Sequence, residues 1–197
     1  MKTYTVMHSN AAPDRDSIPF LSADEVQWLP DAGIRMEARL CYDENRLYVF
    51  QRAWESKVRA EHSEPLAAVC EDSCMEFFFR PENEDRYINF ECNPKGCVYL
   101  GFGYGRDRHV RLLPPPEMFN IQTAILPDGW ELRYELPLSF LRLFYPSLSL
   151  ASGLRLRANC YKCGDKTVQP HYLAWNPLTS ETPDFHRPED FGLLIFA

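Results

Sequence analysis

Short runs of alternating apolar and polar residues follow one another along most of this chain, and this period-two pattern predicts β-strands. Turn-forming residues separate the runs, with Asp-Glu-Asn after residue 42 and Pro-Asp-Gly after residue 126. Most of the 16 prolines also stand between the runs, where no ladder hydrogen bond is lost. The predicted strands lie within 34–55 (two runs joined by a turn), 74–81, 86–93, 96–103, 118–126, 130–138, 154–162 and 191–196.

Helical periodicity is scarce by comparison. Only residues 21–29, with Ser22 as an N-cap, and residues 139–144 carry a helix-like pattern, and both stretches are short. Many short strands joined by turns favour an all-β fold, an antiparallel β-sandwich of the jelly-roll or immunoglobulin-like kind with one or two short helices. Because no internal repeat or low-complexity linker interrupts the pattern, we expect residues 1–197 to form one domain.

The composition is that of an ordinary globular protein, with 45% hydrophobic and 25% charged residues. A net charge of -7 disfavours nucleic acid as a partner, since the one basic cluster is Arg106, Arg108 and Arg111. No stretch approaches the ~18 to 20 apolar residues of a membrane span, so no membrane partner is expected. The N-terminus lacks the apolar core of a signal peptide, which predicts a cytoplasmic protein or a fragment of a longer one. The oligomeric state stays open.

The seven cysteines, an odd number, suit a reducing compartment in which all of them stay thiols. Only Cys160 and Cys163 have the C-x-x-C spacing typical of structural zinc, and they stand in a predicted strand instead of a glycine-rich knuckle. Buried thiols are therefore favoured, with zinc as a minor alternative. The acidic turn at 81–85 offers oxygen donors for a structural calcium but lacks the spacing of a calcium loop, so no metal ligand is predicted.

Two neighbouring predicted strands each place a glutamate among apolar residues. Alternation puts Glu76 on the face opposite Phe77 and Phe79, and puts Glu91 on the face opposite Phe90. A solvated outer face of a half-buried sheet is the plain interpretation. The alternative is a concave sheet surface, on which the carboxylates bind the hydroxyl groups of a polyhydroxylated ligand.

Common catalytic signatures are missing from the chain, which has no G-x-S-x-G, no H-E-x-x-H and no phosphate-binding glycine loop. Instead DSCMEFFFRP, YINFECNPKG, DGWELRYELPLSFL and a C-terminal stretch that begins NCYKCGDK and ends EDFGLLIF occur in this order. Together they resemble the family 9 carbohydrate-binding modules of bacterial glycan use over residues 34–197. The resemblance implies a DOMON-like β-sandwich that binds sugars without turnover, in which aromatic rings clamp the sugar and charged residues bond its hydroxyl groups.

The resemblance also implies site residues on the sheet. The strand glutamate of the family falls on Glu76, and the polar position of the next strand falls on Glu91, where the best-known members have an arginine. A charged residue at a later strand end falls on Lys162. One clamping tryptophan of sugar-binding members is replaced here by Val69 or Cys70, so half of the aromatic clamp is missing.

The C-terminal segment 172–192 is rich in proline and is predicted to be a loop. The remaining clamping aromatic residues of the family fall within it, on Trp175 and on Phe185 or His186. We expect this loop to fold back across the sheet, so that its rings and the two glutamates share a hollow. The further candidate ligand-binding residues are His171, Arg187 and Arg106, of which Arg187 is equally suited to a structural ion pair.

Two other functions stay open from the sequence. Glu76 and Glu91 could act as the acid and the nucleophile or base of a glycoside-processing enzyme, since adjacent strands can hold carboxyls at the ~5 to 9 Å spacing of glycosidases. Some DOMON-like domains instead hold a haem between a methionine and a histidine. Met75 and Met118 lie in predicted strands, but their spacing to the histidines indicates no such pair.

Overall fold

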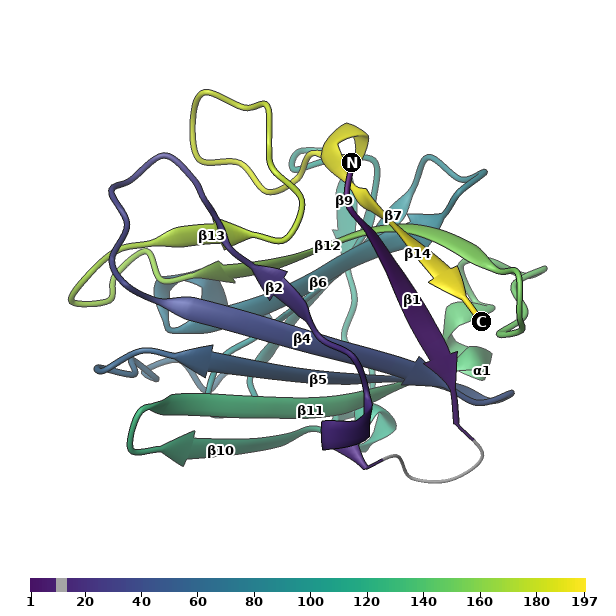
Figure 1. Cartoon of the computed structure of the whole chain (residues 1–197), viewed down its shortest axis with the longest axis horizontal. Coiled ribbons are helices and arrows are strands. Elements are labelled where there is room, and N and C mark those ends of the chain that lie inside the picture. Colours follow the sequence, from purple (N-terminus) through teal and green to yellow (C-terminus); the bar gives the residue numbers. More distant parts are fainter. Residues whose placement is uncertain (10–13) are drawn as a thin grey trace.

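The strands form two layers, which Figure 1 shows with β4, β5, β11 and β10 in front. The computed structural model describes residues 1–9 and 14–197. The strands are β1 (Thr3–His8), β2 (Leu21–Ala23), β3 (Glu25–Val26), β4 (Arg35–Tyr42), β5 (Arg46–Trp54), β6 (Cys74–Pro81), β7 (Tyr87–Cys92), β8 (Val98–Gly103), β9 (His109–Arg111), β10 (Gln122–Leu126), β11 (Gly129–Pro137), β12 (Arg155–Cys163), β13 (Tyr172–Ala174) and β14 (Gly192–Phe196). Helical segments are α1 (Leu138–Leu141) and 3₁₀ turns at Arg15–Ser17, Val69–Glu71, Pro116–Phe119 and Pro188–Asp190. None of the helices in the described part of the chain has the length and apolar character to cross a bilayer.

Hydrogen bonds link the strands in the order β10-β11-β5-β4-β1-β14-β12-β6-β7-β8-β9. The first layer comprises β10, β11, β5 and β4, and the second runs from β14 to β9. β1 joins the layers, because residues 3–6 run parallel to β14 and residues 7–8 run parallel to β4. The other pairings among the described strands are antiparallel. The predicted β-sandwich is confirmed, whereas β1 and its parallel pairings were not predicted.

The main core lies between the two layers. Phe90 of β7 stacks on Tyr134 of β11 with 4.1 Å between ring centroids, which ties one layer to the other. Alternation along β6 sends Met75, Phe77 and Phe79 into the same core. Burying such large side chains stabilises the sandwich by roughly 1.5 to 3 kcal/mol each.

The predicted helix at 21–29 is wrong. Leu21–Ala23 pairs as β2 with β4, and Glu25–Val26 pairs as β3 with β13. Leu21 and Ala23 are buried, so this stretch gains more from burying alternate residues against β4 than from an isolated short helix, whose nucleation is unfavourable. The second helix prediction is confirmed in place, although α1 is shorter and begins one residue earlier than expected.

The outer face of the second layer is also buried. Segments 55–73 and 164–191 contribute residues that cover it, and the predicted alternation of Glu76 and Glu91 onto this face is confirmed. The face is not solvated, however, because these two glutamates are only 2% and 7% exposed. The apolar cluster under the covering segments includes Val69, Phe78, Tyr87, Tyr161, Phe185 and Phe191.

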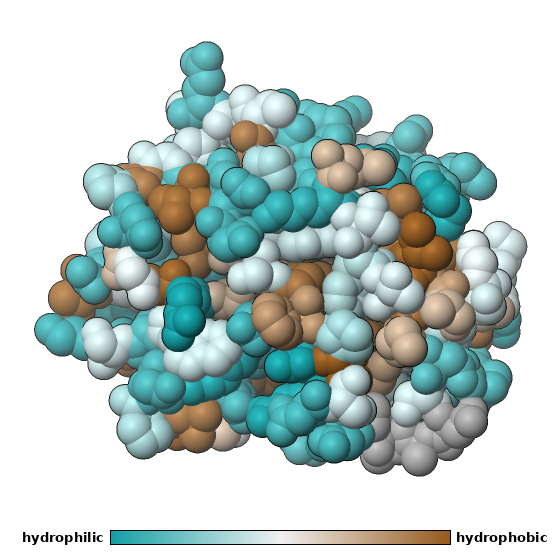
Figure 2. All heavy atoms as spheres, in the orientation of Figure 1, coloured by the Kyte–Doolittle hydropathy of each residue, from teal (hydrophilic) through white to brown (hydrophobic). Residues whose placement is uncertain are grey.

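The outer face of the first layer has a different character. In the orientation of Figure 1, the surface in Figure 2 is largely hydrophilic with separate apolar patches. A groove of about 660 Å³ lies over β4, β5, β10 and β11. Its charged groups pair with one another, as Glu131 accepts a hydrogen bond from Arg15 at 2.7 Å and lies 3.7 Å from Arg52. This groove is therefore internally balanced in charge.

Candidate functional site

A small cavity lies between the covering segments and the outer face of the second layer. Its volume is about 130 Å³, enough for about four water molecules. β6 and β7 contribute Glu76 and Glu91, and the C-terminal loop contributes Phe185 and His186. Residues from at least five separate parts of the chain thus meet around one hollow, which is the usual arrangement of a ligand site.

Glu76 and Glu91 stand opposite one another in the β6–β7 ladder and line the cavity. Glu76 Oε1 accepts a hydrogen bond from the Cys163 thiol at 3.0 Å, and Glu91 Oε1 accepts one from the Asn89 amide at 2.8 Å. Burial, followed by the nearby Glu91 charge, raises the pKa of Glu76 well above its usual range. Burial raises the pKa of Glu91 to about 7, although Asn89 and Arg106 lower it. Because two adjacent buried carboxyls cannot both ionise readily, the pair retains a proton, so it offers a hydrogen-bond donor and an acceptor side by side.

Arg106 supplies the positive charge beside this pair. Its guanidinium lies 3.0 Å from Asp184, whose Oδ1 also accepts the main-chain N–H of His186 at 3.0 Å. The Tyr87 hydroxyl and His186 Nδ1 are 2.6 Å apart. Burial, then the Arg106 charge, lowers the pKa of His186 to about 4, so its imidazole is neutral at pH 7. The C-terminal loop is thereby fixed over the sheet with one guanidinium and one neutral imidazole beside the glutamates.

Three aromatic rings form the apolar side of the cavity. The Trp28 ring lies 5.4 Å from both the Tyr172 ring and the Phe185 ring. Phe185 in turn stacks on Tyr161, with 4.2 Å between centroids. The backbone of Trp28 has a φ of 55°, in the left-handed region, while the indole N–H donates to the Ser180 carbonyl at 2.8 Å. This hydrogen bond holds Trp28 in an unfavourable backbone conformation, with its indole at the cavity.

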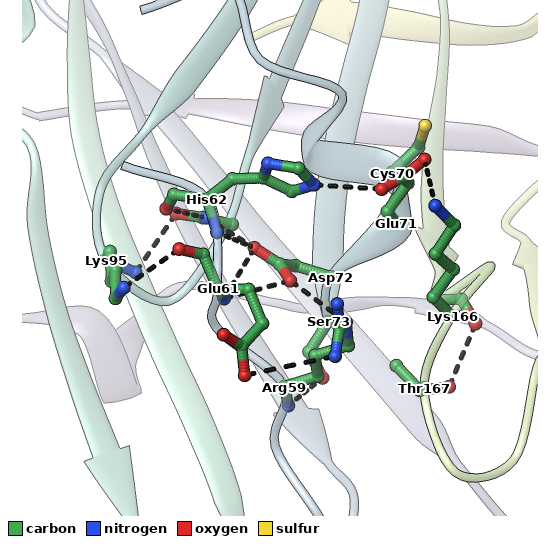
Figure 3. Close-up of polar contacts among 12 residues, drawn as sticks. Arg59, Glu61, His62, Cys70, Glu71, Asp72, Ser73, Lys95, Lys166 and Thr167 are labelled. Carbon is green, nitrogen blue, oxygen red and sulfur yellow. Dashed lines mark hydrogen bonds and ion pairs between the residues drawn. The ribbon is translucent and has the colours of Figure 1, made fainter. Parts of the chain in front are cut away.

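The segment that brings Cys70 to the cavity is held by a buried carboxylate. Asp72 is fully buried and accepts the main-chain N–H groups of residues 61 and 62 at 3.0 and 2.9 Å (Figure 3). Glu71, next to it, pairs with Lys166 at 2.8 Å. These contacts fix the position of the short 3₁₀ turn and hence one wall of the cavity.

The model of carbohydrate-binding family 9 matches residues 8–196 of the chain. The chain belongs to carbohydrate-binding family 9.

Solved structures agree with this assignment. The family 9 domain is similar to a candidate carbohydrate-binding protein from Bacteroides uniformis, with 31% identity and a TM-score of 0.85 over 100% of this chain and 99% of the other. It shares its fold, at 13% identity, with a family 9 module from Caldicellulosiruptor kristjanssonii solved with glucose and with cellotriose. The TM-scores are 0.70 and 0.67, over 100% and 99% of this chain and 96% and 93% of the others. None of the curated proteins matches the sequence.

Of the residues predicted from the sequence, five line the cavity of the family 9 domain, namely Glu76, Glu91, Arg106, Phe185 and His186. Trp28, Tyr172 and Asp165 also line the cavity and were not predicted from the sequence. Trp28 was assigned to a helix that does not form. Tyr172 is the first residue of strand β13 and precedes two buried residues. A strand predicted over 172–174 would have assigned the Tyr172 side chain to one face of the sheet, because side chains alternate along a strand.

Lys162 and His171 lie away from the cavity, which corrects their predicted place in the site. Because Cys163 points into the cavity, its neighbour Lys162 on β12 points to the opposite face. There the fully buried Lys162 Nζ lies 3.1 Å from Glu55 and 2.8 Å from His171 Nε2. The Trp130 indole and the Ser73 hydroxyl donate to the same Glu55 carboxylate at 2.9 and 2.8 Å. Lys162 and His171 therefore belong to a structural ion-pair network.

Trp175 and Arg187 are also outside the cavity. The Trp175 indole is 4% exposed and packs in the main core, where a Cβ on Gly192 would lie 2.6 Å from it. The expectation that this indole shares a hollow with the glutamates is therefore wrong, although the loop itself does cover them. Arg187 forms ion pairs with Glu189 at 2.7 Å and Asp190 at 3.8 Å, the structural alternative considered for it.

The residues considered for zinc, calcium and haem in the sequence are not arranged as such sites. Cys160 faces the main core, while Cys163 faces the cavity, so the C-x-x-C pair does not converge. In the acidic turn at 81–85, Glu82 pairs with Arg155 at 2.6 Å and Glu84 with an arginine at 3.2 Å, an arrangement that does not suit calcium. Met75 is buried in the main core.

The Trp175→Ala substitution is expected to lower the free energy of unfolding by about 3 to 5 kcal/mol, because it leaves a void in the main core. Trp28→Ala is the matched variant and should cost less, since Trp28 is only partly buried. Equilibrium urea unfolding measures both. An equal or larger loss for Trp28→Ala would contradict the placement of Trp175.

Lowering the pH from 6.5 toward 4 is expected to destabilise the domain through His171. Burial, then the Lys162 charge, lowers the pKa of His171 to about 4, below the 6.5 of an unfolded chain. The unfolded chain thus takes up the proton first, and stability that is complete above pH 6.5 falls by on the order of 3 kcal/mol as the pH drops through 4.

His171→Gln should reduce the slope of this part of the stability profile, measured as urea unfolding at a series of pH values. The slope that remains comes from His186, whose pKa burial also lowers to about 4. His8→Gln, at a partly exposed histidine, is the control and should leave the profile unchanged. If the His171→Gln profile runs parallel to that of the unaltered protein, the buried network does not control this pH dependence.

Proposed function

We propose that this family 9 domain binds one sugar residue of a saccharide in the cavity lined by Glu76 and Glu91, without chemical turnover. The observation that supports this most directly is the convergence of two buried carboxyls, one guanidinium and three aromatic rings on a hollow of about 130 Å³. That size suits a single pyranose ring, either a monosaccharide or the end of a longer chain. Family membership supplies the class of ligand.

The polar groups of the cavity match the hydroxyl groups of a sugar. Each hydroxyl both donates and accepts, so recognition needs donors and acceptors side by side. The proton retained by the Glu76–Glu91 pair and the Arg106 guanidinium donate, while the carboxyl oxygens of the pair accept. Hydrogen bonds to charged groups are stronger than neutral ones, so Glu91 and Arg106 contribute most to orientation.

The apolar rings match the other surface of a pyranose. The C–H side of the ring is apolar and packs well on a flat aromatic face, as the family resemblance implies for its clamping residues. We propose that Trp28, which approaches from the N-terminal part of the chain, takes the place of the clamping tryptophan that is missing at Val69 or Cys70. Its neighbours Tyr172 and Phe185 keep the indole in position through edge and tilted ring contacts.

Binding without hydrolysis is favoured over the glycosidase alternative. A glycosidase places its two carboxyls on either side of the scissile bond, whereas Glu76 and Glu91 are side by side on paired strands and Glu76 already bonds to the Cys163 thiol. The Caldicellulosiruptor module was solved with glucose and cellotriose, so gluco-configured sugars are the first probes for this domain.

Isothermal titration calorimetry with glucose, xylose, galactose, cellobiose and cellotriose tests the proposal. Glu91→Gln is expected to weaken binding of the preferred sugar by about 10- to 100-fold, because it replaces a charged acceptor. Trp28→Ala should weaken it by about 2- to 10-fold through loss of the ring face. Arg187→Ala, in the same loop but outside the cavity, is the matched control and should bind as the unaltered domain does.

Unchanged affinity in both Glu91→Gln and Trp28→Ala would place the binding site elsewhere, and absence of binding to all five sugars at millimolar concentration would contradict this ligand choice. Release of reducing sugar from cellotriose during the titration would favour the enzyme instead.

A further inference from the structure

Two thiols and one carboxyl gather just below the candidate saccharide cavity. Cys74 of β6 stands directly opposite Cys163 of β12, and Glu76 is two residues along β6 on the same face. The two Sγ atoms and a carboxylate oxygen of Glu76 all lie within 4.8 Å of one another. All three side chains are buried, with exposures of 0%, 1% and 2%.

We propose that Cys74, Cys163 and Glu76 bind one zinc-like divalent cation, with a fourth coordination position open toward the cavity. The site does not depend on the proposed saccharide binding, because its three ligands come from two paired strands and need no sugar.

The spacing of the ligand atoms fits tetrahedral coordination. Bonds of about 2.3 Å to sulfur and 2.1 Å to oxygen set neighbouring ligand atoms about 3.6 to 3.8 Å apart. The Cys163 Sγ to Glu76 Oε1 distance is 3.0 Å, and the remaining distances are no longer than 4.8 Å. Small side-chain rotations on two rigid, hydrogen-bonded strands therefore suffice to form the site.

The charges around the cavity favour a cation. Glu76 and Glu91 are buried and line it, and within the described ranges neither forms an ion pair with a lysine or arginine. Arg106, a basic residue in this lining, is already paired with Asp184. Buried acids without a basic partner either stay protonated or are compensated by a bound cation.

The ligand atoms select the kind of metal. Calcium and magnesium require oxygen ligands, whereas zinc accepts thiolate and carboxylate together. Three protein ligands and one open position are typical of zinc sites that bind a further small molecule. Cys163 and Glu76 face the cavity, so the cation can enter through it and the open position points toward it.

Cobalt titration of the full chain, after reduction and treatment with a chelator, tests the proposal. One equivalent of Co²⁺ should give visible d–d bands of tetrahedral strength and a near-ultraviolet thiolate charge-transfer band, both abolished by excess Zn²⁺. Cys163→Ser should reduce the charge-transfer band by about half or more, because it removes one of the two thiolate ligands. Cys160→Ser is the matched control, because Cys160 lies on the same strand but faces the main core, and it should keep the band.

Cys74→Ala is the second variant, in case Cys163→Ser fails to fold, and circular dichroism monitors the fold of each. Absence of a thiolate band in the unaltered protein would overturn the proposal, as would a band of full strength in both Cys163→Ser and Cys74→Ala. Recovery of Cys74 and Cys163 as a disulfide from reductant-treated protein would also overturn it.

Discussion

The burial of acidic side chains on the outer face of a sheet is the constraint on which the site depends. A half-buried antiparallel sheet usually turns its polar face to water. Here the covering segments remove Glu76 and Glu91 from solvent, and a buried carboxyl must keep a proton or gain a partner. The covering segments in turn depend on Asp72, which binds two main-chain N–H groups of the segment in front of it. The chemistry of the cavity therefore follows from the way loops are fixed across three strands.

The second layer also separates two buried polar clusters, one on each face of the sheet. Glu76 and Cys163 face the cavity, whereas Lys162, next to Cys163 on β12, reaches Glu55 on the other side of the sheet. Because side chains alternate, a shift of β12 by one residue would bring the Lys162 ammonium to the acids and leave Glu55 without its cation. Such a shift is strongly unfavourable, because it would break the buried ion pair between Lys162 and Glu55. Two polar clusters, both costly to bury, help to specify one register.

The sequence predicted what depends on periodicity and missed what depends on distant contacts. Alternation in β6 and β7 placed Glu76 and Glu91 on one face, and the loop residues Phe185 and His186 were expected there as well. Trp28 was missed because its place depends on a hydrogen bond to residue 180, far along the chain. Trp175 was predicted to contact ligand because it stands in a polar segment of the sequence. Its indole packs in the core instead, in space that is free because Gly192, distant in the sequence, has no side chain. β1 had too short a pattern to reveal that it joins both layers.

Glu76 is a proposed contact of the sugar and a proposed ligand of the cation. The binding of one is therefore expected to change the affinity for the other. If the cation changes the affinity for the sugar by some factor, the sugar changes the affinity for the cation by the same factor, because the two binding free energies are linked. If a sugar hydroxyl fills the open coordination position, each ligand strengthens the other. If the sugar instead needs a hydrogen bond donated by Glu76, metal binding removes that donor and the two ligands weaken each other. The sign of the linkage therefore reports whether Glu76 contacts the sugar as a hydrogen-bond donor or as part of a metal centre.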